Sequence, residues 1–171
     1  GTLDLVNSIL SSNSTASNGG GIYVTSMEDG GISDFSMINS TIIDNSSNLD
    51  GGGLYLNGNI TIDSSFVKMN FAGNDGAGIY GNGVAHIIFT EIDSNYSINS
   101  GGGLWWGSEQ LTITQSKCRY NNAYQGGGMY IESDNPIIEF TEISNNLSTT
   151  IGGGILFNKI SSASSPIINN C

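Results

Sequence analysis

Charged residues are scarce in this chain of 171 residues, and positively charged ones are scarcest of all. Only 11% of the residues are charged, just four are Lys or Arg, and the formal net charge is −11. Nucleic acids and anionic membrane surfaces bind through clustered Lys and Arg, so this composition argues against both classes of partner. The chain also lacks any hydrophobic run near the ~20 residues of a membrane span, so we expect no direct membrane insertion.

Cysteine, proline and histidine are nearly missing as well, with two, two and one copies. The two cysteines, Cys118 and Cys171, do not make the disulfide framework of a small secreted domain. His86 has no second His or nearby Cys with which to hold a metal ion, and we interpret it as a surface residue. No stretch keeps a 3.6-residue hydrophobic period, so the sequence predicts almost no helix.

Glycine and asparagine are abundant instead, with 25 and 21 copies, and they form two repeating signatures. A glycine cluster recurs six times, followed each time by an apolar residue and usually by an aromatic one. After a first interval of 32 residues, the clusters return every 25 or 26 residues. They begin at Gly19, Gly51, Gly76, Gly101, Gly126 and Gly152. Such regularity predicts a repeat architecture.

The second signature is an apolar residue, two variable residues and then Asn. An Asn side chain at a bend can bond the backbone of the next coil, so we predict an asparagine ladder along the molecule. Its members are Asn13, Asn45, Asn70, Asn95, Asn121, Asn146 and Asn170.

A period of about 25 residues decides between solenoid types. Helical repeats need ~33–47 residues, and the Leu-x-x-Leu-x-Leu pattern of leucine-rich repeats is missing. We therefore predict an all-β, right-handed, single-stranded parallel β-helix (β-solenoid) of six to seven coils. Residues 1–171 form one domain, either part of a longer chain or a subunit of a stacked filament. Residues 26–31 are predicted to be a loop inserted in the first coil.

Within each coil we expect three short strands and, between the Asn and the glycines, a polar turn. Another turn, such as Asn57–Asn59, separates the first two strands. Alternation along the first strand points Leu54 and Leu56 inward and Tyr55 outward. The outward aromatics should stack as an external ladder formed by Tyr23, Tyr55, Tyr80, Trp105 and Tyr130. Trp106 could belong to this outer surface or point inward as core.

The pairing of an apolar-x-x-Asn segment with Gly-Gly-x-apolar resembles the repeat of the chlamydial polymorphic outer-membrane protein passenger domains. That resemblance covers nearly the whole chain and implies a β-helical adhesin at a cell surface. Ile, Leu or Val stand here where the family motif has Phe.

Catalytic groups are sparse. The only arginine, Arg119, has no acidic residue within eight positions, although neighbouring coils could bring Asp93 or Glu142 near it. Glu91 and Glu142 occupy equivalent positions, but two coils separate them by roughly 10 Å. We predict no catalytic residues and no enzyme activity. Asp50 and Asp75 precede consecutive glycine clusters and are the candidates for a calcium site, the only cofactor considered.

These features favour an extracellular or cell-surface structural and adhesive module that associates end to end with copies of itself or with further coils. The alternative is a carbohydrate-binding or polysaccharide-degrading protein, with glycans stacking on exposed aromatics such as Trp105. Ice binding is less consistent, because Thr61 and Thr112 do not recur in every coil. Of six Asn-x-Ser/Thr sequons, Asn39 and Asn59 are the better glycosylation candidates, because the other four are ladder residues.

Overall fold

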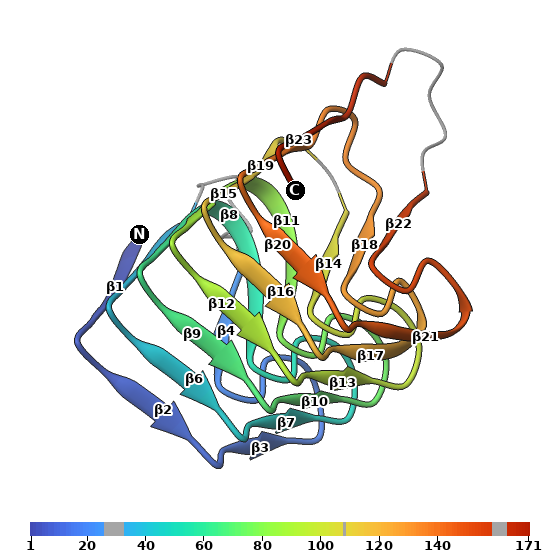
Figure 1. Ribbon diagram of the computed structural model, residues 1–171. Coiled ribbons are helices and arrows are strands. Elements are labelled where there is room, and N and C mark those ends of the chain that lie inside the picture. Colours follow the sequence, from blue (N-terminus) through green and yellow to red (C-terminus); the bar gives the residue numbers. More distant parts are fainter. Residues whose placement is uncertain (26–32, 108, 159–163) are drawn as a thin grey trace.

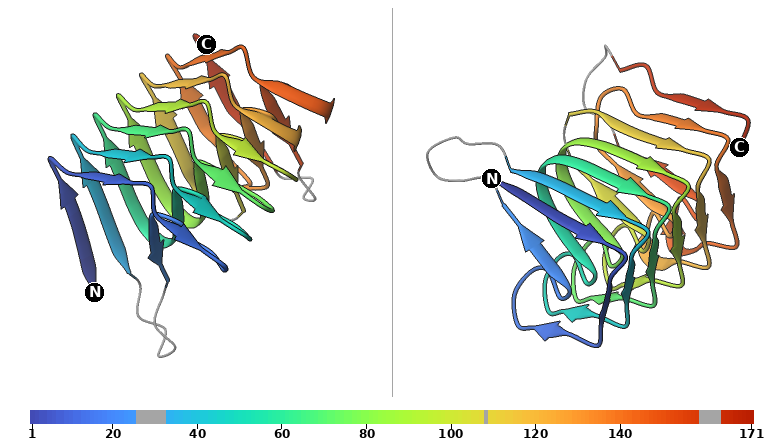
Figure 2. Two further views of the ribbon diagram at one scale, coloured as in Figure 1. Left: turned by 90° about the horizontal axis from the view of Figure 1, so that it is seen from below. Right: turned by 90° about the vertical axis from the view of Figure 1, so that its left-hand side faces the viewer.

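The computed structural model describes residues 1–25, 33–107, 109–158 and 164–171, and within these ranges it is all-β without a helix. The chain winds into a parallel β-solenoid in which each strand pairs with a strand about 25 residues further on, as Tyr55 does with Tyr80. Figures 1 and 2 show the coils as successive layers, with the N-terminus at one end of the stack. The predicted insertion at 26–31 lies outside the described residues.

Three parallel sheets run the length of the stack. Sheet A has eleven strands: β1 (Thr2–Val6), β4 (Ile22–Val24), β5 (Asp34–Ile38), β8 (Leu54–Asp63), β11 (Ile79–Ile88), β14 (Leu104–Trp106), β15 (Leu111–Thr114), β18 (Met129–Ile131), β19 (Ile137–Glu139), β22 (Ile155–Phe157) and β23 (Ile167–Asn169). Sheet B has six: β2 (Ile9–Ser11), β6 (Thr41–Ile43), β9 (Phe66–Lys68), β12 (Glu91–Asp93), β16 (Lys117–Arg119) and β20 (Glu142–Ser144). Sheet C has six: β3 (Ser14–Thr15), β7 (Ser46–Ser47), β10 (Phe71–Ala72), β13 (Tyr96–Ser97), β17 (Asn122–Gln125) and β21 (Leu147–Ile151).

Two local predictions were wrong. The expected turn at Asn57–Asn59 is part of β8, which continues for ten residues and stays paired with β11 throughout, with Gly58 (φ of 144°) opposite Gly83. The segment after each ladder Asn, expected to be a polar turn, carries the short strands of sheet C. Its residues range from Ser14 to Phe71 and Leu147, and stacking gives their backbone groups partners in the next coil.

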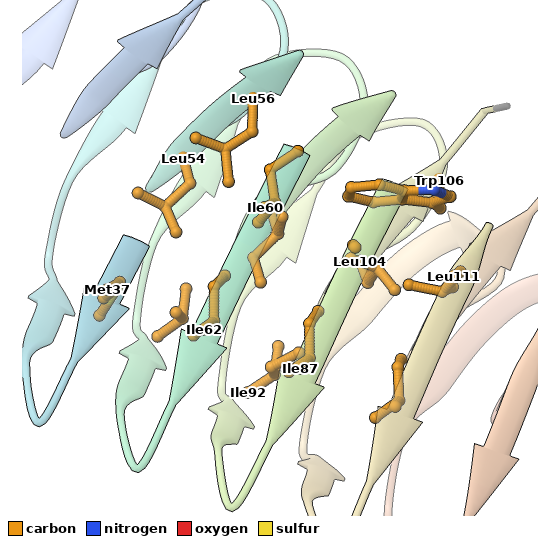
Figure 3. Close-up of a cluster of buried hydrophobic side chains, with 14 of the residues drawn as sticks. Met37, Leu54, Leu56, Ile60, Ile62, Ile87, Ile92, Leu104, Trp106 and Leu111 are labelled. Atoms are coloured by element: carbon orange, nitrogen blue, oxygen red, sulfur yellow. The ribbon is translucent and has the colours of Figure 1, made fainter. Parts of the chain in front are cut away.

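The core is a set of stacked inward columns (Figure 3). Met37, Ile62 and Ile87 stand in register and are at most 1% exposed, and their column extends to Leu5 on one side and to Ile113 and Ile138 on the other. Trp106 also points inward and is fully buried. Its ring occupies the space beside Gly81, where a Cβ would lie 2.0 Å from the Trp106 Cζ3 atom.

Three corners join the sheets in each coil, and each corner contains a residue with positive φ. At two corners this residue is not glycine, and it can be as large as Phe89 or Tyr120. At the third corner it is the first glycine of a cluster, such as Gly51 with φ of 67°. The second glycine is needed for a different reason, because a Cβ on Gly52 would lie 2.1 Å from the carbonyl oxygen of Phe71.

Candidate functional site

The asparagine ladder lies at the corner between sheets B and C and is buried in the middle coils. The Oδ1 of Asn95 accepts hydrogen bonds from the backbone N–H of Asn70 at 3.0 Å and from its Nδ2 at 3.0 Å. The Nδ2 of Asn95 donates to the carbonyl oxygen of Val67 at 3.0 Å. The same pattern joins the six residues Asn13, Asn45, Asn70, Asn95, Asn121 and Asn146. The ladder therefore fastens each coil to the next.

Asn170 is not a member of this ladder, so that part of the prediction was wrong. β23 pairs with β19 so that Asn169 lies opposite Glu139, which places Asn170 level with Phe140 at the corner between sheets A and B. The connection from the last glycine cluster to β23 is four residues longer than its counterpart in the preceding coil. This extra length accounts for four of the six positions by which Asn170 falls short of the ladder, and the other two arise because Asn170 follows Gly152 by 18 residues where Asn146 follows Gly126 by 20.

A second ladder, of hydroxyl groups, was missed by the sequence analysis. At the corner between sheets A and B, Ser40 Oγ accepts the backbone N–H of Ser8 at 3.0 Å and donates to the carbonyl of Ile38 at 2.8 Å. The ladder contains Ser8, Ser40, Ser65, Thr90, Ser116 and Thr141. Each of them precedes a ladder Asn by five residues, a spacing that could have revealed the ladder. Cys171 follows Thr141 in register, and its thiol donates to the carbonyls of Asn169 and Ile138 at 3.3 and 3.6 Å.

The two calcium candidates lie in neighbouring coils and already accept amide hydrogen bonds. Asp50 Oδ1 accepts from Asn74 Nδ2 at 2.7 Å, and Asp75 Oδ1 accepts from the Ser100 backbone N–H at 2.8 Å. Burial raises the pKa of Asp75, the hydrogen bond from the Ser100 backbone opposes that shift, and the charge of Asp50 adds to it. Across the described ranges, no three His, Cys, Asp or Glu side chains gather as a metal site.

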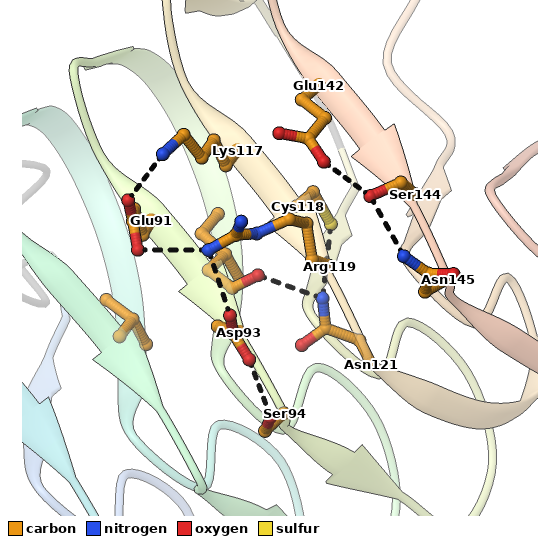
Figure 4. A network of polar contacts seen from close by, with 12 residues as sticks. Glu91, Asp93, Ser94, Lys117, Cys118, Arg119, Asn121, Glu142, Ser144 and Asn145 are labelled. Atoms are coloured by element: carbon orange, nitrogen blue, oxygen red, sulfur yellow. Dashed lines mark hydrogen bonds and ion pairs between the residues drawn. The ribbon is translucent and has the colours of Figure 1, made fainter.

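Arg119 belongs to a four-residue ion cluster on sheet B (Figure 4). Its Nη2 lies 3.2 Å from Glu91 Oε2 and 3.3 Å from Asp93 Oδ2, while Lys117 Nζ lies 2.9 Å from Glu91 Oε1. The cause is register, because Glu91 pairs with Lys117 and Asp93 with Arg119 in adjacent strands. Glu142 flanks Lys117 on its other side. The arginine thus serves as an ion-pair partner of two carboxylates.

The aromatic ladder forms a continuous stack on the outer face of sheet A. Tyr55 and Tyr80 have ring centroids 4.9 Å apart, and Tyr80 and Trp105 have centroids 4.5 Å apart with an interplanar angle of 4°. Tyr23 extends the stack at one end, and Tyr130 extends it at the other with a centroid distance of 6.2 Å. Burial, with smaller contributions from Asp50 and Tyr55, raises the pKa of Tyr80 to about 12.

Tyr130 departs from the prediction of an external residue, because it is only 8% exposed. Trp105 stacks on one side of it, Leu156 lies in register on the other, and Asn158 Nδ2 donates to its hydroxyl at 2.6 Å.

The remaining single residues are placed as follows. Asn39 and Asn59 are exposed, and their side-chain amides donate to Asn7 at 2.6 Å and to Asp34 at 2.9 Å. His86 is exposed on β11. Cys118 is fully buried as a core residue, and burial raises the pKa of its thiol to about 12.

A group of exposed aromatic and apolar side chains on sheet C was not anticipated. Tyr96 and Tyr124 are 47% and 50% exposed, and Asn122 lies between them because it pairs with Tyr96 and precedes Tyr124 by two residues in β17. The sequence analysis overlooked them because it treated this segment as a turn.

Comparisons give this chain no relatives: no family model, no curated protein and no solved structure matches it. The described residues also contain no helix that is long and apolar enough to cross a membrane. What can be said of function therefore rests on the solenoid and its surfaces.

Proposed function

We propose that this chain is an extracellular structural and adhesive module, not an enzyme, whose coils stack end to end into longer rods. The observation that carries the proposal is the complementarity of the two ends of the described stack. At each end the outermost strands have no partner on one side among the described residues, and their hydrogen-bonding groups fit either the other end of a second copy or a further coil of the same chain.

The N-terminal end offers acceptors. Asn13 Oδ1 receives no hydrogen bond from any described residue, although the equivalent atom of every later ladder Asn does. Leu10, the inward residue of this coil, is only partly buried, whereas the next residue in its column, Ile42, is fully buried. A further coil would bury Leu10 and supply the missing donor.

The C-terminal end offers the matching donor. The backbone N–H of Asn146 donates to no described residue, and Ile143 is only partly buried. An Asn146 N–H facing an Asn13 Oδ1 of a second copy would repeat one internal step of the ladder. Such head-to-tail contacts do not close on themselves and build filaments.

The role at a surface is supported by composition and by the lack of a catalytic arrangement among the residues that the structure describes. Arg119, which a lyase-like mechanism would need as a base, is held between Glu91 and Asp93. The repeat motifs that resemble chlamydial polymorphic outer-membrane protein passengers favour an adhesin, and short amide and hydroxyl side chains suit a solvent-facing rod. The exposed Asn39 and Asn59 are the positions that we propose for glycosylation.

Sedimentation velocity and negative-stain microscopy over a concentration series test the stacking. The wild-type chain should form rods that lengthen as concentration rises. Ser11→Pro should stop the lengthening of the rods. The backbone N–H of Ser12 donates to Ile43 at the end of β6, so the N–H of Ser11 points the other way, toward the outer edge of β2. Proline removes this N–H and places its ring at that edge.

Phe89→Ser serves as a matched control, since Phe89 is 53% exposed at a corner and lies on neither end. This variant should stack like the wild-type chain. Single-length particles of the wild-type chain at every concentration would refute the stacking.

A further inference from the structure

The outer face of sheet C carries a cluster of exposed side chains, which we call the tyrosine face. It runs across four neighbouring strands, β10, β13, β17 and β21, which lie side by side in Figures 1 and 2. Tyr96, Tyr124 and Leu147 are 47%, 50% and 58% exposed. The face consists of Phe71, Tyr96, Ile98, Asn122, Tyr124 and Leu147. No described element covers it.

The rings of the tyrosine face differ from those of the aromatic ladder in what their faces touch. In the ladder, Tyr80 is covered on both sides by parallel rings less than 5 Å away, so mainly ring edges remain accessible. In the tyrosine face, Phe71 and Tyr96 are 5.8 Å apart and tilted by 47°. On its other side Tyr96 is in register with Asn122, which carries no ring. Tyr96, at 47% exposed, is therefore not held between parallel rings as Tyr80 is.

The tyrosine face is also electrically neutral, on a chain whose formal net charge is −11. None of its six residues is an acid or a base apart from the weakly acidic tyrosine hydroxyls. The nearest basic residues in sequence, Lys68 and Arg119, both belong to strands of sheet B, where Lys68 lies over the Phe66 ring and Arg119 is engaged by Glu91 and Asp93. This face therefore offers no charged group to pair with a cationic or an anionic ligand. An anionic ligand would also be repelled by the net negative charge of the rest of the molecule.

From these observations we infer that the tyrosine face binds an uncharged carbohydrate chain. Sugar rings present C–H groups that pack on aromatic faces, and their hydroxyls need both donors and acceptors, which the Asn122 amide and the tyrosine hydroxyls supply. This binding activity goes beyond the proposed stacking and does not depend on it.

A polysaccharide fits this surface better than a folded protein does. Protein-binding hot spots combine Tyr with Trp and Arg in desolvated pockets, and neither Trp nor Arg belongs to this face. The face is instead a row of positions repeated about every 4.8 Å along the rod, which a linear polymer can follow.

The test is a glycan array that carries uncharged glucans, mannans, xylans and galactans, with polyuronates as charged comparators. Titration calorimetry then measures the affinity for the glycan that binds best. The wild-type chain should bind a neutral glycan and not a polyuronate. Tyr96→Ala and Tyr124→Ala should each weaken that binding about tenfold or more, because each removes a stacking platform. Tyr124→Phe should retain most of the affinity, since it keeps the ring.

Tyr23→Ala is the matched control, because Tyr23 is 52% exposed but lies on sheet A, and it should bind like the wild-type chain. Far-ultraviolet circular dichroism shows whether each variant is folded. Failure to bind any neutral glycan, a preference for polyuronates, equal loss in Tyr23→Ala, or unchanged binding in folded Tyr96→Ala and Tyr124→Ala overturns the inference. Rod formation by the same variants is measured separately, so a failure of stacking remains distinguishable from a failure of glycan binding.

Discussion

Each internal asparagine side chain of the ladder satisfies two backbone groups of the preceding coil. Asn95 accepts from the N–H of Asn70 and donates to the carbonyl of Val67, both in the preceding coil, and it is 1% exposed. Water cannot replace these hydrogen bonds at a buried site. Removing them therefore lowers the free energy of unfolding by the full desolvation penalty of the backbone groups that are left without partners. The side-chain amide of each internal ladder asparagine is therefore required for the stability of the fold.

Asn95→Ala should lower the free energy of unfolding by about 3 kcal/mol, because it leaves at least two buried backbone groups without partners at 1–3 kcal/mol each. Urea denaturation followed by circular dichroism measures the change. Asn59→Ala, at an exposed position, should change stability by no more than about 0.5 kcal/mol. Equal effects of the two substitutions would show that burial of the ladder is unimportant.

Asp75 is a residue whose charge works against folding. Burial raises the pKa of the Asp75 carboxyl in the folded state. The contribution of Asp75 to the free energy of unfolding is therefore complete below about pH 4, which is the pKa of Asp in an unfolded chain. That contribution declines as the pH rises through the folded-state pKa. Asp75→Asn should thus be more stable than the wild-type chain at pH 7, and the difference should vanish near pH 3.

The substitution keeps the acceptor, because Asn18 Oδ1 already accepts the backbone N–H of Asp50 at 3.0 Å in the equivalent place. Thermal unfolding between pH 3 and 7 provides the measurement. A variant that is less stable at pH 7 would show that the carboxylate charge strengthens the bonds from Ser100 and Asn99 by more than burial costs.

At the scale of strands, side-chain charge follows register. β12 carries Glu91 and Asp93 where β16 carries Lys117 and Arg119, so correct pairing brings opposite charges together. These groups are partly exposed, and ion pairs of this kind contribute only about 0.2–1 kcal/mol. Their effect is to disfavour a slipped alignment of the two strands.

A charge-swap cycle tests this pairing. Glu91→Lys places like charges opposite each other and should destabilise the chain by about 1 kcal/mol, and Lys117→Glu should act similarly. The double variant should recover at least half of the summed loss, and the coupling should weaken in 1 M salt. Strict additivity of the two substitutions in urea denaturation would contradict the direct pairing.

Sequence periodicity predicted the parts of this fold that repeat. It missed the features that depend on contacts between particular residues of neighbouring coils. The period of the glycine clusters predicted parallel stacking, because equal chain lengths per turn place equivalent residues above one another. It could not place Asn170, since a longer connection before β23 and a shorter spacing between Gly152 and Asn170 together put that motif at another corner. Nor could it reveal the burial of Tyr130, which depends on Leu156 and Asn158 in the next coil.

The surfaces were predicted less well than the core for the same reason. Inward residues such as Ile62 and Ile87 follow from strand alternation alone. The tyrosine face was hidden because Tyr96 and Tyr124 lie in strands of two and four residues, too short to show an alternating pattern. Comparing equivalent positions of successive repeats would have shown both this face and the ion cluster.

For the whole molecule, stability should vary along the axis. Each coil contacts only its neighbours, and the end coils have a neighbour on one side alone. Amide hydrogen exchange should therefore be slowest in β9 and β12 and at least about tenfold faster in β2 and β20, where local opening needs fewer bonds to break. Mass spectrometry after proteolysis resolves these segments.

Protein concentration provides a control for this gradient. At concentrations where rods lengthen, β2 and β20 should become protected, because stacking gives them partners. Uniform exchange across all coils at low concentration would show that the solenoid opens only as one cooperative unit.

The left-handed corners have a consequence for how this protein can evolve. The hydrogen-bonded ladders beside these positions do not require one residue type there, and Asn, Ser, Asp, Met, Phe, Tyr and Gln all occur. Two rows of outward positions can consequently accumulate changes while the framework persists. A solenoid built in this way can change its outer surface coil by coil without having to refold around each substitution.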